Sequence, residues 1–196
     1  MSAKLSNEAL EQLFTKARTH NGWRDEDVPD ALLREALDIA KWGPTSANGS
    51  PMRVLFLRSQ EAKQRLAPAL IPGNLAKTMA APIVAIVAYD LNFYQHLPRL
   101  YPATDARSWF VGNQALIEET AFRNGALQGA YLLLALRAVG LDVGPMSGFD
   151  KAMVDAEFFP EGTVKSNFLV NIGYGDEAKL YPRGPRFAFD EIARIL

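Results

Sequence analysis

The sequence contains no cysteine, and its only histidines are His20 and His96. The absence of cysteine excludes disulfides, thiolate metal sites and cysteine nucleophiles. Two histidines leave little for a histidine-rich zinc centre, so no metal site is expected. A chain without cysteine also fits a reducing compartment.

Charge of one sign is not in excess either. The 21 basic and 22 acidic residues give a formal net charge of −1. A general nucleic-acid binder needs a strongly basic face, so no nucleic-acid partner is expected. This balance still leaves room for a small basic pocket.

Long hydrophobic runs are missing as well. The longest apolar stretch lies between Arg123 and Arg137, whereas a membrane-spanning helix needs about 20 apolar residues. Residues 1–10 lack the apolar run of a signal peptide. We therefore expect a cytoplasmic protein with no membrane partner. The length of 196 residues fits one domain, 1–196, that buries roughly 70% of its unfolded surface.

The spacing of apolar residues predicts helices mixed with a few strands. Because helices separate the strands, the order favours an α+β or α/β fold in which helices pack on a small mixed sheet. The predicted helices are residues 6–18, 29–42, 61–67, 73–80, 112–139, 151–158 and 187–195, and the predicted strands are residues 54–57, 83–89, 141–148 and 168–172.

Two of these regions carry further expectations. Residues 90–110, rich in aromatic side chains, are predicted as a long loop that forms either a lid or a dimer contact. The second half of the long helix, residues 130–139, is apolar on every side except at Arg137. Such a helix must be enclosed by its own domain or by a partner subunit.

Two familiar motifs are present only in part. Residues 173–178 match the dinucleotide pattern G-x-G-x-x-A after an apolar strand, but Pro182, Gly184 and Pro185 follow too closely for the helix that a Rossmann site requires. Residues 144–148 resemble the nucleophile elbow of serine hydrolases, but the first glycine is one position too far from Ser147. We reject both interpretations.

Polar clusters give a different indication. Residues 18–21 are polar at a helix end, residues 44–48 carry hydroxyl and amide groups, and Asn74 and Lys77 share a helix face. Arg183 and Arg186 bracket a stiff Gly-Pro turn. Each cluster alone has an ordinary explanation as a cap, turn or surface charge. Together they offer arginines and hydroxyls for a phosphate, and amides and a lysine for a polar ring.

Taken in order, these segments resemble the nitroreductase family of FMN-dependent oxidoreductases. The likeness covers nearly the whole chain and includes the P-T-S-A-N-G-S-P loop at residues 44–51. Several segments are similar to the malonic semialdehyde reductase branch, which is associated with bacterial pyrimidine degradation. The segments that carry the resemblance are residues 17–24, 41–51, 73–78, 105–110, 118–124, 144–150 and 171–176.

The resemblance implies an α+β fold, an intertwined homodimer with FMN at its interface, and NADH or NADPH as reductant. It implies that Arg18, Thr19 and His20 contact the phosphate and ribityl region of FMN, and that Arg183 and Arg186 help to bind the phosphate. Asn74 and Lys77 would meet the pyrimidine edge of the flavin, and Ser147 and Gly148 would lie over its N5 region. The other subunit would contribute Pro44, Thr45, Ser46 and Asn48.

The family often has a basic residue where this chain has Gly22, so Lys77 is the candidate for stabilising the reduced flavin. Because flavin itself carries out hydride chemistry, reductant and substrate can use one site in turn. The branch implies reduction of malonic semialdehyde to 3-hydroxypropanoate. From the composition of this loop region we hypothesise that Arg107 or Arg123 binds the substrate carboxylate and that Trp109 or Phe110 closes over the ring. A general nitro or quinone reductase and a flavin-free small-molecule binding protein remain as alternatives.

Overall fold

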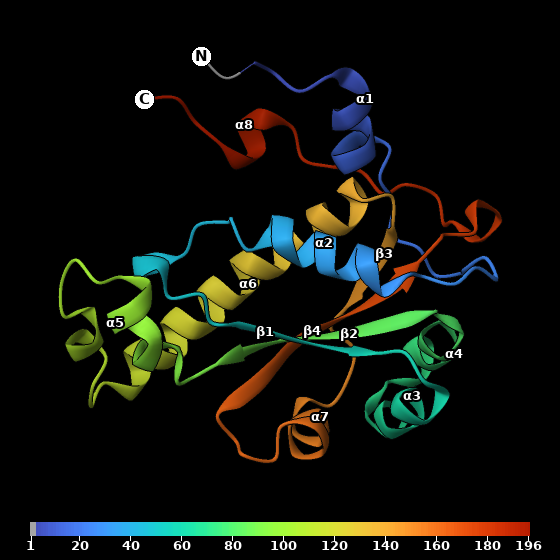
Figure 1. Cartoon of the computed structure of the whole chain (residues 1–196). Helices are drawn as coiled ribbons and strands as arrows, with labels where there is room; N and C mark the ends of the chain where they lie inside the picture. The colour runs from blue at the N-terminus through green and yellow to red at the C-terminus, as the bar shows by residue number, and fades with distance from the viewer. Residues whose placement is uncertain (1–2) are drawn as a thin grey trace.

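A four-stranded sheet forms the centre of the computed structural model, which describes residues 3–196 (Figure 1). The strands lie in the order β1-β2-β4-β3, and every neighbouring pair is antiparallel. Two helices join β1 to β2, instead of the single crossover helix of a parallel unit. The strands are β1 (Met52–Leu57), β2 (Ile83–Asp90), β3 (Asp142–Met146) and β4 (Val164–Gly173).

The prediction of an α+β fold is confirmed, but the prediction of a mixed sheet is wrong, because all four strands pair antiparallel. Parallel pairing within the described residues is limited to an isolated bridge between Thr19 and Val143. The predicted single domain, 1–196, includes Met1 and Ser2, which lie outside the described residues.

The helices agree closely with the predicted ranges. The predicted helix at residues 6–18 is a short α-helix followed by a π-helical turn, Glu11–Thr15. The other predicted helices differ from the observed ones by a few residues at their ends, and α5 lies in the predicted loop. The helices are α1 (Asn7–Leu10), α2 (Asp30–Ala40), α3 (Gln60–Leu66), α4 (Pro72–Ala80), α5 (Leu97–Leu100), α6 (Gln114–Ala138), α7 (Lys151–Phe158) and α8 (Phe189–Ile192). None of the helices within residues 3–196 has the length and apolar character needed to span a membrane.

Alternating residues of β2 separate two hydrophobic cores. Ile83, Ala85 and Val87 pack with α2 and α6, whereas Val84 and Ile86 pack on the opposite face. Because strand side chains alternate between faces, a strand that is apolar throughout must be covered on both sides. Residues 83–88 have no exposed surface, which confirms that expectation.

The stretch from 90 to 110 is more ordered than predicted. It contains α5 and two 3₁₀ turns, Phe93–His96 and Ala106–Trp109. Phe93, Leu97 and Phe110 form part of a third hydrophobic cluster, so aromatic packing replaces the predicted loop with short helical turns.

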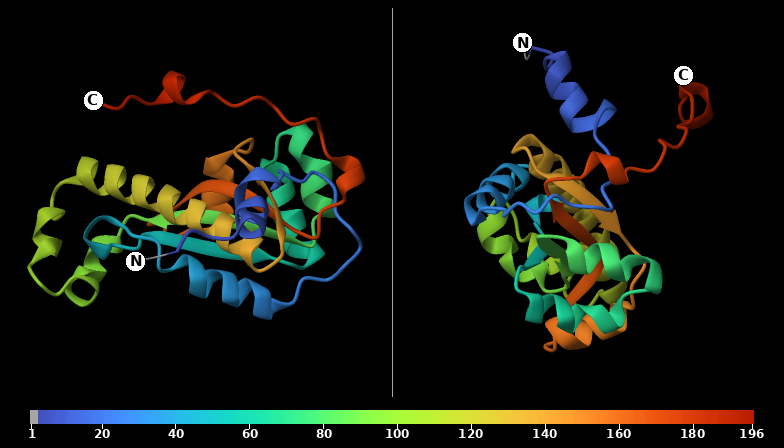
Figure 2. Two further views of the ribbon diagram at one scale, coloured as in Figure 1. Left: turned by 90° about the horizontal axis from the view of Figure 1, so that it is seen from above. Right: turned by 90° about the vertical axis from the view of Figure 1, so that its right-hand side faces the viewer.

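One face of α6 is not enclosed within this chain. Phe122, Leu127 and Tyr131 are 47%, 46% and 40% exposed. The C-terminal segment 187–196 runs clear of the body in both views of Figure 2. Its large apolar residues, Phe187, Phe189, Ile192, Ile195 and Leu196, are exposed as well. The chain itself buries Leu132, Ala135 and Leu136 of the apolar half, and the face of α6 that it leaves uncovered is the one with Phe122, Leu127 and Tyr131.

Gly125 marks the close approach of α6 to β2. A Cβ atom at Gly125 would lie 2.8 Å from the Cβ of Tyr89, a carbon that cannot move without its strand. We predict that Gly125→Ala lowers the free energy of unfolding by about 2 kcal/mol, because the overlap outweighs the better helix propensity. The melting temperature should fall by about 4–8 °C.

Gly73→Ala is the matched control, because a Cβ atom at Gly73 of α4 would meet nothing within 4 Å. This variant should be about as stable as the parent or more stable by about 0.5 kcal/mol. Equal melting temperatures for Gly125→Ala and the parent would contradict the close packing of α6 on β2.

Candidate functional site

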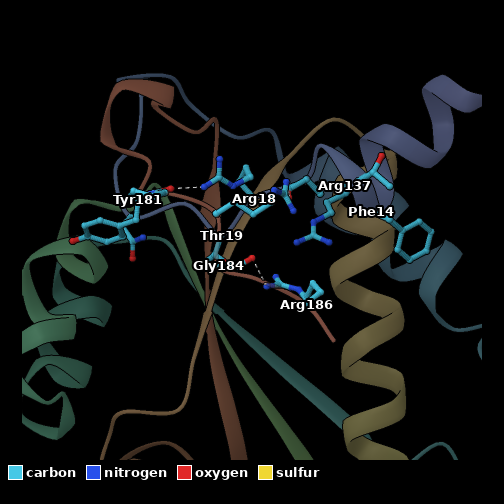
Figure 3. Close-up of a pocket in the computed structure, with 12 residues that line it drawn as sticks. Phe14, Arg18, Thr19, Arg137, Tyr181, Gly184 and Arg186 are labelled. Carbon is cyan, nitrogen blue, oxygen red and sulfur yellow. Dashed lines mark hydrogen bonds between the residues drawn. The ribbon is translucent and has the colours of Figure 1, made fainter. Parts of the chain in front are cut away.

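A basic pocket of about 620 Å³ lies where three distant parts of the chain meet. Figure 3 shows Arg18, Arg137 and Arg186 converging on the space between the end of α6 and the C-terminal segment. No carboxylate is among the residues that line this arginine pocket: Phe14, Thr15, Ala17, Arg18, Thr19, Asn21, Arg137, Tyr181, Pro182, Arg183, Gly184 and Arg186.

The edge of the sheet holds the N-terminal side of the arginine pocket in place. The backbone N–H of His20 donates to the carbonyl of Val143 on β3 at 3.1 Å. A Cβ atom at Gly144 would lie 2.4 Å from the carbonyl oxygen of His20, so only glycine allows the segment to approach β3 this closely. Residues 18–21 are therefore positioned by β3.

The side chain of His20 lies away from the arginine pocket. It lines an adjoining hollow of about 880 Å³ and is only 5% exposed. Its Nε2 is 3.3 Å from Oδ1 of Asp142, whose Oδ2 accepts from the backbone N–H of Gly175 at 2.8 Å. In this chain His20 fastens the N-terminal segment to the ends of β3 and β4.

Two arginines join the N-terminal and C-terminal segments reciprocally. Arg18 donates to the carbonyl of Tyr181, and Nη2 of Arg183 donates to the carbonyl of Ala17 at 2.9 Å. Each guanidinium has five N–H donors, so both arginines keep donors for a ligand. We call these two residues the arginine pair.

A second group of polar side chains lies on α4. Nδ2 of Asn74 donates to the carbonyl of Gly148 at 2.8 Å, and Nζ of Lys77 donates to Oδ1 of Asn21 at 3.2 Å. A Cβ atom at Gly148 would lie 2.7 Å from Nδ2 of Asn74, so a larger residue here would displace the Asn74 amide. Asn21 also lines the arginine pocket, and it therefore connects the pocket to the α4 group.

Gly22 occupies the position where the resemblance leads one to expect a cation. The aliphatic chain of Lys179 fills the adjacent space, with its Cδ 2.2 Å from where a Cβ of residue 22 would lie. The ammonium of Lys179 is 3.4 Å from a carboxylate oxygen of Asp176. Lys77 therefore remains the cation beside Asn21.

The residues predicted to come from a second subunit lie at the other end of α6. The backbone N–H of Ser46 donates to Oδ1 of Asn124 at 2.8 Å. Asn124 precedes Arg137 by 13 residues, which is about 20 Å along a helix. Pro44, Thr45, Ser46 and Asn48 are thus remote from the arginine pocket of their own chain.

The loop that carries these residues has an unusual backbone. Ala47, Asn48 and Ser50 have positive φ angles of 48°, 51° and 43°. Nδ2 of Asn48 donates to the carbonyl of Leu100 at 2.8 Å, which ties the loop to α5. Backbone strain of this kind persists where the surroundings hold it, and it is frequent at ligand sites.

The predicted substrate residues also lie on this side of α6. Nε of Arg107 donates to Oε1 of Gln95 at 2.7 Å, and Arg123 pairs with Glu119 one helical turn away. Trp109 is 51% exposed. Neither the arginine pocket nor the adjoining hollow is lined by Arg107, Trp109 or Arg123.

Arg137 is a member of the arginine pocket that sequence reasoning did not predict. In the sequence it stands out only as the polar exception in an apolar stretch. A lone cation in the last turn of an apolar helix is a usable signal, because that turn also carries unpaired carbonyl groups. Burial lowers the pKa of the Arg137 guanidinium, and the charge of Asp142 opposes this shift. Residues 3–196 contain no cluster of histidine and carboxylate side chains suited to a metal ion.

Comparison with known proteins identifies the family. Residues 14–174 match the model of the nitroreductase family, so the chain belongs to the nitroreductase family. A protein of Burkholderia lata, which carries the provisional name NADH dehydrogenase/NAD(P)H nitroreductase, is 66% identical over 191 residues. This match covers 97% of the chain and 98% of the relative.

Solved structures agree on the fold. A nitroreductase-named protein of Exiguobacterium sibiricum, solved in complex with FMN, has a TM-score of 0.85 and 20% identity over the full length of both chains. A nitroreductase-named protein of Bacillus subtilis has a TM-score of 0.84 and 19% identity, covering 97% of this chain and 100% of the other. At these identities the similarity establishes the nitroreductase-like fold.

Proposed function

We propose that this chain is an FMN-dependent NAD(P)H oxidoreductase and that the arginine pocket binds the FMN phosphate. The observation that carries the proposal is a pocket with four arginines and no carboxylate among its lining residues. A phosphate monoester carries close to two negative charges at neutral pH and accepts paired hydrogen bonds from guanidinium groups. The FMN complex of the Exiguobacterium sibiricum protein, which has the same fold, supports this choice of ligand.

The α4 group fits the ring end of the same ligand. Asn74 offers an amide that is already oriented by Gly148, and Lys77 offers an ammonium that is oriented by Asn21. When bound, FMN supplies hydride transfer between NAD(P)H and the substrate. Lys77 would place positive charge beside the pyrimidine edge, where it favours the reduced ring.

Two such chains would complete the site as a homodimer. The loop with Thr45 and Ser46 is about 20 Å from Arg137 along α6 of its own chain, so it can reach an arginine pocket only on a second copy. The exposed faces of α6 and of residues 187–196 offer apolar surface for that contact. A dimer would also enclose the exposed face of α6 with Phe122, Leu127 and Tyr131.

We propose that the substrate is malonic semialdehyde and that the enzyme acts in pyrimidine degradation. Its reduction adds a hydride to the aldehyde carbon and a proton to the oxygen, which gives 3-hydroxypropanoate. Arg107 suits the substrate carboxylate better than Arg123, because its guanidinium is held by the neutral amide of Gln95 while Arg123 is already paired with Glu119. The provisional name of the Burkholderia lata relative favours the second candidate, a general nitroreductase.

The proposed phosphate contact predicts that loss of Arg183 weakens the binding of FMN more than the binding of riboflavin. Arg183→Gln should weaken FMN binding about 10- to 100-fold, because a charge-assisted hydrogen bond contributes about 1.5–3 kcal/mol. Riboflavin lacks the phosphate, so its affinity should change less than about twofold. Fluorescence titration of apoprotein measures both constants. A parent protein that binds neither flavin would contradict the proposed function, and equal losses for both flavins would contradict the phosphate contact.

The dimer predicts a charge-sensitive interface. Leu127→Glu should produce monomers at concentrations where the parent chain forms dimers, because it places a carboxylate on the uncovered apolar face of α6. Flavin should be lost with the dimer. Met153→Glu on α7 is the control, since Met153 is equally exposed at 45% but lines a hollow shared with Arg65 of α3. Sedimentation velocity measures the states, and a parent chain that is monomeric at micromolar concentration would overturn the homodimer.

The proposed substrate predicts a selective effect at Arg107. Arg107→Gln should raise the KM for malonic semialdehyde about tenfold and leave the KM for a neutral quinone within about twofold, because only the aldehyde carries a carboxylate. Arg123→Gln should have a smaller effect, since Glu119 already neutralises Arg123. Steady-state kinetics with both substrates tests this. Parallel changes for aldehyde and quinone would rule out a carboxylate contact at Arg107.

A further inference from the structure

Lys63 is a buried cation that the proposed flavin site does not use. It lies on α3, and only 7% of its surface is exposed. Its Nζ donates to the carbonyl of Met79 at 3.2 Å and to the carbonyl of Ala81 at 2.9 Å. Both carbonyls lie at the C-terminal end of α4, which packs beside α3 (Figure 1). Lys63 therefore binds the end of the helix that carries Lys77.

The surroundings of Lys63 disfavour a charged group. Burial lowers the pKa of the Lys63 ammonium. In residues 3–196 no carboxylate forms an ion pair with Lys63. A cation at the C-terminus of a helix is stabilised by the partial negative charge of the carbonyl groups there. The two carbonyls therefore hold the ammonium in place, and the ammonium in turn holds the last turn of α4.

The last turn of α4 has a second side-chain donor from outside the helix. Nε1 of Trp23, a buried residue, donates to the carbonyl of Lys77 at 3.3 Å. The backbone N–H of Ala81 donates to the carbonyl of Thr78 at 3.2 Å. A helix leaves its last four carbonyls without partners inside the helix. Trp23, the N–H of Ala81 and Lys63 supply partners for the carbonyls at positions 77, 78 and 79.

Side-chain contacts between this turn and the sheet are weaker. Nδ2 of Asn171 on β4 lies 3.4 Å from Oγ1 of Thr78, which is longer than a usual N–H···O bond. Oγ1 of Thr78 donates to Sδ of Met146 at 3.5 Å, and a thioether is a weak acceptor. Hydrogen bonds from a charged donor are stronger than such contacts. Lys63 therefore contributes most to the polar anchoring of this turn.

The position of the turn determines where the ammonium of Lys77 lies. Nζ of Lys77 is 3.2 Å from Oδ1 of Asn21, at the long end of the range for such a bond. Asn21 follows His20, whose backbone N–H is bonded to β3. The contact thus joins two segments that are held independently of each other. A small displacement of the last turn of α4 would break it and leave the ammonium of Lys77 without a defined direction.

We propose that Lys63 is a positioning residue that acts through Lys77: by holding the last turn of α4, it keeps the Lys77 ammonium beside the edge of FMN that gains negative charge on reduction. This inference rests on the proposed function, because it takes Lys77 as the cation at the pyrimidine edge of the flavin. Lys63 acts on the ligand only through α4.

The reduction potential of bound FMN tests this role without turnover. Lys63→Met removes the ammonium and nearly keeps the length of the side chain. In the FMN-loaded protein, the affinity for reduced FMN relative to oxidised FMN should fall about tenfold, because the reduced ring carries the charge that Lys77 faces. For a two-electron couple this change lowers the potential by about 30 mV. Equilibration with a dye of known potential measures it.

A double-mutant cycle separates positioning from a direct effect of the Lys63 charge. Lys77→Met should lower the same affinity ratio at least about tenfold, and adding Lys63→Met should then change the ratio less than about twofold. Lys63→Arg keeps a cation and should recover most of the loss. Lys165→Met is the control, because Lys165 pairs with Asp155 near the start of β4, whereas Asn171, which contacts α4, lies near its end. The control should leave the ratio unchanged.

The results distinguish this role from the alternatives. An unchanged ratio in Lys63→Met overturns the proposal, and so does an equal loss with and without the Lys77 ammonium. Equal weakening of oxidised and reduced FMN also overturns it, because a merely structural lysine has that effect. If Lys63→Met does not fold, Lys63→Gln keeps N–H donors without the charge and should lower the ratio about threefold, and no change overturns the proposal. A parent protein that binds no FMN contradicts the proposed function as well.

Discussion

Repulsion among like charges is the constraint around which this site is built. Four guanidinium groups meet in one pocket without a carboxylate among the lining residues. Backbone carbonyls compensate in part, because Tyr181, Ala17 and Leu13 accept from three of these arginines. Carbonyl oxygens carry only partial charge, so they orient the guanidinium groups without neutralising them. The pocket therefore keeps its attraction for anions while its arginines stay in defined positions.

This arrangement depends on the edge of the sheet. The bridge between Thr19 and Val143 and the His20–Asp142 pair hold the N-terminal segment beside β3. The C-terminal segment is then fastened to that segment by the arginine pair. Each chain terminus is thus positioned by the other and by β3, which explains why the site combines residues that are more than 160 positions apart.

The sequence predicts local structure well because local structure follows from local patterns. The run at residues 83–89 predicts a covered strand, and β2 is buried on both faces. The antiparallel direction of β1 and β2 depends on how the connecting helices α3 and α4 turn the chain back. A pattern of apolar residues does not specify that connection. Residues 90–110 lack helical periodicity, and their short turns form because Phe93 and Phe110 pack together. Arg137 was missed as a site residue because its neighbours in the pocket are distant in sequence.

The length of α6 separates the two polar regions of one chain. Asn124 orients the hydroxyl-rich loop near the middle of the helix, and Arg137 reaches the arginine pocket at its end. A rigid helix keeps these groups about 20 Å apart, which exceeds the reach of any side chain. An antiparallel arrangement of two copies would bring the loop of one α6 toward the arginine end of the other. The same contact would cover Leu127 and Tyr131, so burial of apolar surface and completion of the site would stabilise one interface together.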